Sequence, residues 1–108
     1  MAKKHLGLWR ITEMGRWDPD FIDLIVPGFI RFDARGVGEF QFGTVHGHLK
    51  YRSGGFEDKY RIVFAWEGDI ETMPAKGTGW AEIGHEGLRG HIYIQEGDDS
   101  WFKAQRAG

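Results

Sequence analysis

The sequence predicts an all-β protein, a single antiparallel β-barrel domain over residues 1–108 with about seven or eight short strands and at most one short helix. Seventeen glycines are spread along the 108 residues, so few intervals between them are long enough for a helix. The intervals alternate apolar and polar residues and are rich in aromatic and β-branched side chains, which is typical of half-buried strands. No long amphipathic helix separates them. An antiparallel meander that closes into a barrel is therefore favoured over a parallel sheet.

The predicted strands are recognised by their period of two. In residues 37–45, Phe40 and Phe42 fall on one face and Glu39 and Gln41 on the other. Residues 60–66 are apolar on both faces after Arg61, which predicts the most central strand. The remaining predicted strands are residues 6–11, 28–34, 48–52, 79–83, 88–95 and 100–106.

One segment, residues 18–26, has the features of a short helix. Asp18 is a suitable N-cap, Pro19 suits the first turn, and Pro27 would end the helix. A further strand over residues 21–26 is the alternative interpretation, and the pattern does not separate the two.

Two turns and one long loop are expected between the strands. The Gly-His-Glu-Gly run at residues 84–87 predicts a hairpin turn, and residues 54–58 predict another turn. Residues 69–76 are mostly polar and contain Pro74, which predicts the longest irregular segment apart from the Asp18 region. Long loops in compact barrels often carry binding sites.

Composition excludes several functional classes. The 14 basic and 16 acidic side chains leave a net charge of −2, which argues against a dedicated nucleic-acid binder. Without cysteine there is no disulfide framework, no thiolate nucleophile and no sulfur-ligated zinc. The N-terminus has no apolar stretch before Arg10, and no run approaches the roughly 20 apolar residues of a membrane span. We expect a soluble, cytoplasmic protein without a membrane partner.

Both ends of the chain carry residues that resemble a known superfamily. Gly7-Leu8-Trp9 lies on the first predicted strand, and Arg106 lies on the last. This resembles the calycins (lipocalins, fatty-acid-binding proteins and avidins), in which the tryptophan of G-x-W packs at the closed end of the barrel against an arginine of the last strand. The resemblance implies barrel closure by Trp9 and Arg106, where a cation covers the indole face. It also implies a calycin-like barrel whose open end binds a small, mostly apolar molecule.

A second resemblance carries no function. The chain is similar to a family of small uncharacterised bacterial proteins in four runs, which are residues 17–20 (Trp-Asp-Pro-Asp), 27–32 (Pro-Gly-Phe-Ile-Arg-Phe), 38–43 (Gly-Glu-Phe-Gln-Phe-Gly) and 97–100 (Gly-Asp-Asp-Ser).

The leading functional hypothesis is non-catalytic binding of a small, partly apolar molecule in the barrel mouth. Aromatic side chains would form the walls and a few polar groups would orient the ligand. The candidate ligand-binding residues are Trp66, Trp80, Phe40, Phe42, Tyr93, Glu82 and Arg61. The alternative is a protein–protein interaction module, because a barrel built from so short a chain can be filled by its own side chains.

Three glutamates lie within or beside predicted strands, namely Glu13, Glu39 and Glu82. Any of them that faces inward must be hydrogen-bonded or paired, and Arg61 or Arg31 would be natural partners. Such a group is either a structural ion pair or an anchor for a ligand.

The third hypothesis is a histidine-ligated metal site or metalloenzyme. His46 and His48 are two residues apart, so on a strand both imidazoles share one face and could bind one metal ion. His85 and His91 are the candidates for a third ligand, subject to the fold. The alternative is a pair of solvent-facing histidines without a ligand role.

Other catalytic signals are weak. Serine occurs only at Ser53 and Ser100, neither within Gly-x-Ser-x-Gly. We therefore expect a protein that is not an enzyme and has no cofactor, and whose partner is a small-molecule ligand or another protein. The oligomeric state does not follow from the sequence.

Overall fold

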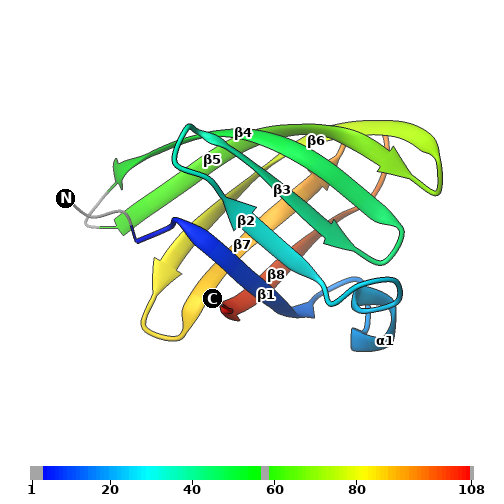
Figure 1. The fold of residues 1–108 in the computed structure, drawn as a ribbon, viewed down its shortest axis with the longest axis horizontal. Helices are drawn as coiled ribbons and strands as arrows, with labels where there is room; N and C mark the ends of the chain where they lie inside the picture. Colours follow the sequence, from blue (N-terminus) through cyan, green and yellow to red (C-terminus); the bar gives the residue numbers. More distant parts are fainter. Residues whose placement is uncertain (1–3, 57–58, 108) are drawn as a thin grey trace.

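The computed structural model describes residues 4–56 and 59–107 as a closed antiparallel barrel, which confirms the predicted all-β fold. Each strand pairs with the next along the chain, and β1 also pairs with β8 to close the barrel (Figure 1). The elements are β1 (Gly7–Met14), α1 (Pro19–Ile22), β2 (Phe29–Phe32), β3 (Val37–Phe42), β4 (Val45–Phe56), β5 (Lys59–Ile70), β6 (Met73–Gly84), β7 (Gly87–Ile94) and β8 (Asp99–Arg106).

The ambiguous segment contains a short helix and not a strand. Asp18 caps α1 by accepting a hydrogen bond from the Phe21 amide at 3.0 Å, with Pro19 in the first turn as expected. The helix ends at Ile22, where Asp23 takes the C-cap position, well before Pro27. Among the described residues, no helix is long and apolar enough to cross a membrane.

The prediction of a long loop over residues 69–76 is wrong. β5 continues to Ile70 and β6 begins at Met73, so only Glu71 and Thr72 form the turn, both with positive φ. Pro74 is tolerated because it lies in the part of β6 that extends beyond its pairing with β7, where the missing N–H costs no ladder bond. The hairpin turn at residues 84–87 is confirmed, whereas β4 extends through residues 54–56 and residues 57–58 lie outside the described residues.

The described barrel interior is packed with aromatic rings. Phe40 contacts Phe42 and Trp66, with ring centroids 5.9 and 5.1 Å apart. Glycines make room for these rings: a Cβ built on Gly47 would lie 2.7 Å from Trp66 and 2.8 Å from Phe40. In the same way, a Cβ built on Gly79 would collide with the Phe64 ring, and one built on Gly90 would collide with the Phe102 ring. Large aromatic rings and glycines thus face one another across the core, as expected for a close-packed protein interior.

Side chains also plug both ends of the barrel. At the end where β1 begins, Tyr60 donates to His5 Nδ1 at 2.9 Å, and His5 Nε2 lies 3.1 Å from the Tyr51 hydroxyl. Tyr51 itself donates to the Asp33 carbonyl, so in the neutral imidazole Nε2 carries the proton and Nδ1 accepts. Burial raises the pKa of Tyr51.

At the opposite end, α1 lies beside the β3–β4 turn (Figure 1). Ile22 is 1% exposed, and Trp17 lies between Phe21 and Phe42 at ring distances of 5.9 and 5.0 Å. Gly43 donates its amide to the Ile22 carbonyl at 3.0 Å. Among the described residues, side chains therefore occupy both ends of the barrel, with a hollow of about 240 Å³ beside His5, Tyr51 and Tyr60.

Gly47→Ala tests the tight packing of the core. The new methyl group would collide with the rings of Trp66 and Phe40, so we expect the free energy of unfolding to fall by about 2 kcal/mol. Gly54→Ala, also on β4, is the matched control, because its Cβ meets no atom within 4 Å and should change stability by less than about 0.5 kcal/mol. Urea unfolding followed by tryptophan fluorescence measures both. Equal effects of the two substitutions would contradict a close-packed interior.

Asp23 should contribute to acid sensitivity. The Gly28 amide donates to its carboxylate at 2.8 Å and, with a smaller contribution from Arg10, holds the pKa of Asp23 below its ordinary value of 3.8. The ionised carboxylate therefore stabilises the fold at higher pH, and this stabilisation is lost as pH falls through the lowered folded-state pKa. Asp23→Asn should flatten the loss of stability with acid, as measured by unfolding between about pH 6 and about pH 2. Asp20→Asn, on the same short helix, is the control, and an identical acid profile for Asp23→Asn and wild type would refute the role.

Candidate functional site

A broad hollow lies on the outer face of the barrel. It is a groove of about 820 Å³, lined mostly by outward-facing residues of β3 to β7. The strand twist makes a barrel surface concave along its axis, and here the three twelve-residue strands β4, β5 and β6 extend that concavity. A groove of this volume matches the size of small-molecule sites.

The floor of the groove is formed by short and apolar side chains. Ala65 and Thr78 face each other across β5 and β6, and Thr78 pairs in turn with Tyr93 on β7. Val37 extends this row on β3, opposite Lys50. Val37 and Tyr93 are 39% and 41% exposed, so the floor offers accessible apolar surface.

Charged side chains form the rim of the groove. Arg31 is occupied by two carboxylates, with Asp33 Oδ1 and Glu39 Oε1 each 3.1 Å from its guanidinium. Both ion pairs raise the pKa of Arg31, the Asp33 hydrogen bond most. Lys50 and Lys76 also line the groove and form no ion pair with any described residue. Lys50 lies in the row between Val37 and Ala65, whereas Lys76 lies across from Glu67, which also lines the groove. Lys50 is therefore the cation that is most available to an anion.

A histidine–carboxylate cluster lies at one wall of this groove. The β3–β4 register places Glu39 opposite His48 and Gln41 opposite His46. His46 Nε2 lies 2.5 Å from Glu39 Oε2, and the two imidazole rings are 4.9 Å apart. The hydrogen bond from His46, and then that from Arg31, hold the pKa of Glu39 below its ordinary value. Glu39 and His48 line the groove itself.

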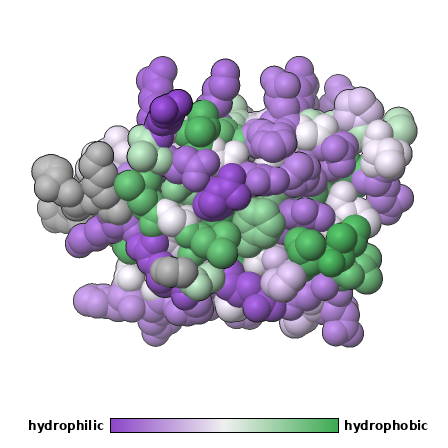
Figure 2. Space-filling model, in the orientation of Figure 1, coloured by the Kyte–Doolittle hydropathy of each residue, from purple (hydrophilic) through white to green (hydrophobic). Residues whose placement is uncertain are grey.

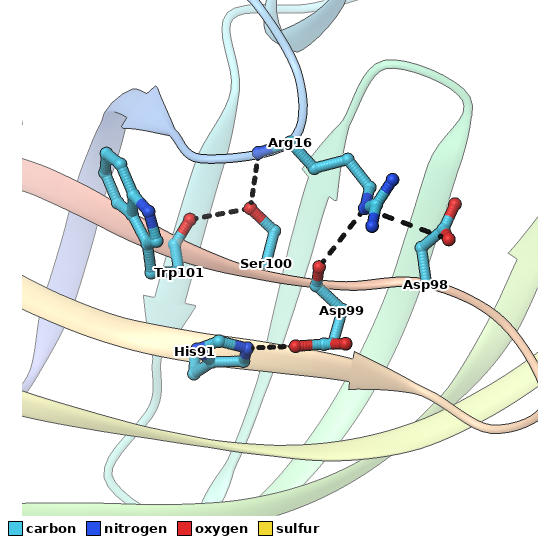
Figure 3. Close-up of polar contacts among 6 residues, drawn as sticks. All are labelled: Arg16, His91, Asp98, Asp99, Ser100 and Trp101. Atoms are coloured by element: carbon cyan, nitrogen blue, oxygen red, sulfur yellow. Dashed lines mark hydrogen bonds and ion pairs between the residues drawn. The ribbon is translucent and has the colours of Figure 1, made fainter.

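The other candidate metal ligands lie elsewhere. His91 on β7 is paired with Asp99 on β8 at 2.5 Å (Figure 3). His85 lies in the turn between β6 and β7. Arg16 reaches the same region of β8, where its amide donates to Ser100 Oγ at 3.0 Å. These contacts tie the segment after β1 to β8. The third group beside His46 and His48 is therefore Glu39 and neither of the other two histidines.

The structure separates the predicted ligand-binding residues into two sets. Phe40, Phe42 and Trp66 point into the barrel and are at most 2% exposed, packed against one another. Trp80 lies on the outer face, since its two chain neighbours Gly79 and Ala81 are buried on the inner face of β6. Trp66 and Trp80 therefore do not line one interior cavity. Of the predicted set, Tyr93 and Trp66 border the outer groove.

Arginine partners were expected for a glutamate that faces inward, but Glu82 and Glu39 pair with Arg61 and Arg31 on the outer face. Arg61 donates to Glu82 Oε2 through Nε at 2.9 Å and Nη2 at 2.6 Å, and Arg89 lies 3.3 Å from Oε1. The Arg61 guanidinium also covers the Trp80 ring at 4.6 Å. This network buries Glu82 to 4% exposure without placing it in the barrel interior. It is a structural ion-pair network across β5, β6 and β7.

Trp9 and Arg106 meet as expected. They are cross-strand partners on β1 and β8, and the guanidinium carbon of Arg106 lies 4.1 Å from the Trp9 ring centroid. Arg106 also donates to the carbonyls of Lys4 and Leu6, while the Trp9 indole donates to the His5 carbonyl at 3.0 Å. Together these contacts fasten the N-terminal segment over this end of the barrel.

A separate apolar surface lies beside α1. Leu24 and Ile25 are 60% and 59% exposed, and hydrophobic side chains gather at this end of the molecule (Figure 2). Two adjacent exposed aliphatic residues of this kind are a possible contact point for another protein.

Sequence reasoning missed Glu39 as a partner of the histidine pair. The signal was present, because Gly43-Thr44 forms a two-residue turn between β3 and β4, and Gly43 has the positive φ such turns require. Counting outward from that turn places Glu39 opposite His48. The outer groove has no comparable signal, since it depends on the coiling of several strands.

Comparisons with protein-family models, curated proteins and solved structures found no match for this chain.

Proposed function

We propose that this protein binds a small, partly apolar, anionic molecule without chemical conversion, in the outer groove and not in a barrel mouth. The observation that carries this proposal is the groove of about 820 Å³ over β3 to β7, at a place where the interior is filled. Small-molecule sites are concave, largely apolar and provided with a few polar groups that orient the ligand. The cytoplasmic location expected from the sequence is retained as part of this proposal.

The lining suggests how such a ligand would lie. A flat apolar group would rest on Ala65 and Val37 against the Tyr93 ring, and its anionic group would approach Lys50 or Lys76. Arg31 is less available, because Asp33 and Glu39 already occupy it. Specificity would come from these few charges and affinity from the apolar floor.

Binding without catalysis is favoured by the hydrogen bonds that the buried Ser100 hydroxyl makes. Ser100 is 4% exposed, and its hydroxyl donates to the Trp101 carbonyl at 2.9 Å while accepting from the Arg16 amide (Figure 3). Because this hydroxyl gives its proton to a backbone carbonyl, it is not hydrogen-bonded to a general base among the described residues.

A protein–protein interaction module is the second candidate function. The filled interior and the exposed pair Leu24 and Ile25 favour it. Sedimentation velocity on the wild type and on a Leu24→Ser, Ile25→Ser double variant tests the simplest partner, a second copy of this chain. Association that the double variant abolishes would support the module, and a monomer at every concentration would leave self-association without support.

Filling the groove should abolish ligand binding. Anilinonaphthalene sulfonate, which is apolar, flat and anionic, serves as the probe, titrated by fluorescence in the presence of EDTA. We expect Ala65→Trp to weaken binding at least about tenfold, because the indole would occupy the floor beside Thr78. Val63→Trp is the matched control, since Val63 is exposed on the same face of β5 but does not line the groove.

Charge reversal gives an independent check of the same site. Lys50→Glu and Lys76→Glu should each weaken binding of the anionic probe, whereas Lys103→Glu on β8 should not. Probe binding that is unaffected by Ala65→Trp, or equally affected by Val63→Trp, would overturn the assignment to the groove.

A further inference from the structure

Three side chains able to ligate a metal ion converge on the outer face of the β3–β4 hairpin. Glu39 lies on β3, and His46 and His48 lie on β4. One ligand atom from each residue lies within 4.8 Å of the other two. His46 and His48 share a face because they are two residues apart on a strand, and Glu39 joins them through its register with His48.

The backbone that presents these groups is well defined. The hairpin turn at Gly43-Thr44 is anchored to α1 by the hydrogen bond from the Gly43 amide to the Ile22 carbonyl. Behind the ligands, Val45 and Leu49 are buried in the core at 2% and 1% exposure. The three side chains are therefore carried by a strand pair that is held on its inner face, while their own tips remain accessible.

The spacing suits a small divalent ion. Zn²⁺ binds histidine nitrogen and carboxylate oxygen at about 2.0–2.1 Å in tetrahedral geometry, which places ligand atoms about 3.3 Å apart. To bind the ion, the distance of 2.5 Å between His46 Nε2 and Glu39 Oε2 would have to increase by about 0.8 Å. The distance between any other two ligand atoms would have to decrease by at most about 1.5 Å. Side-chain rotations on an accessible strand face accommodate shifts of this size.

We infer that Glu39, His46 and His48 form a binding site for a divalent transition-metal ion of the Zn²⁺ class. Two imidazoles and one carboxylate are a donor set that such ions prefer, and Mg²⁺ or Ca²⁺ would instead require more oxygen ligands. The His46 contact is made by Glu39 Oε2, so binding would replace that hydrogen bond with two bonds to the ion.

Neighbouring charges support this site. Arg31 holds the other carboxylate oxygen of Glu39, which orients Oε2 toward the histidines. Asp33 in turn pairs with Arg31 and offsets its charge. On the other side of β4, the register places Glu67 opposite His48 and Asp69 opposite His46. The ion would therefore sit among more carboxylates than cations.

Three protein ligands leave one tetrahedral position open to water or to another ligand. Glu39 and His48 also line the groove, so this open position would face a molecule bound there. Recruitment of an anionic ligand group by the ion rests on the proposed function of the groove, whereas binding of the ion does not.

Isothermal titration of tag-free protein with ZnCl₂, after dialysis against EDTA, tests the site. We expect about one ion per chain with a dissociation constant in the micromolar range or tighter. His46→Gln, His48→Gln and Glu39→Gln should each weaken binding at least about tenfold. His85→Gln and His91→Gln are the matched controls, because these histidines lie outside the cluster and should leave the affinity unchanged.

A second measurement needs no variant. Nuclear magnetic resonance of the histidine ring nitrogens in the wild type should show Zn²⁺-dependent shifts for His46 and His48, with His85 and His91 unaffected. Absence of binding at micromolar Zn²⁺, or equal losses in the control variants, would overturn the site and leave only adventitious binding to surface histidines. Because the groove titration is carried out in EDTA, failure of the metal site would not imply failure of the groove, and the reverse also holds.

Discussion

Aromatic rings fill the inside of the barrel, and the rest of the structure depends on their packing. These rings belong to Phe40, Phe42, Phe64, Trp66 and Phe102. A closed barrel of eight strands has an interior just wide enough for side chains. Rings of this size fit only where the facing residue is glycine, as at Gly47, Gly79 and Gly90. The glycines therefore provide the space that the aromatic rings occupy. With that space filled, the described interior leaves no room for a ligand.

A filled interior moves the chemically active groups to the outer face. Glu82 is nearly buried there by two arginines and the neighbouring Trp80, in a network that joins β5, β6 and β7. The same alternation that turns apolar residues inward turns Glu39, His46 and His48 outward along β3 and β4. Strand coiling then makes this outer face concave, so that residues of six strands, β2 to β7, line one groove.

The groove and the histidine cluster share the β3–β4 hairpin, and this link is physically significant. Glu39 and His48 are common to both, while Arg31 joins Glu39 to the rim of the groove. An ion held at the cluster would add positive charge beside a groove that already carries Lys50 and Lys76. Both features would then favour an anionic ligand. The hairpin is held from the inside by buried Phe42, Val45 and Leu49, which limits movement of the shared residues.

By itself, the sequence determined the barrel and the approximate strands, because both follow from local periodicity and the spacing of the glycines. It left the segment after Asp18 open between a helix and a strand, and it named Arg61 and Arg31 only as partners for a glutamate that faces inward. The contact of Trp9 with Arg106 was implied by a family resemblance and not by periodicity. Only the tertiary structure decided that residues 69–70 and 73–76 belong to strands, because the pairing of β5 with β4 and β6 outweighs their polar composition. It alone also separated Trp66 inside from Trp80 outside and created the groove. Register and strand coiling determine these outcomes, and both are set by contacts between residues distant in the chain.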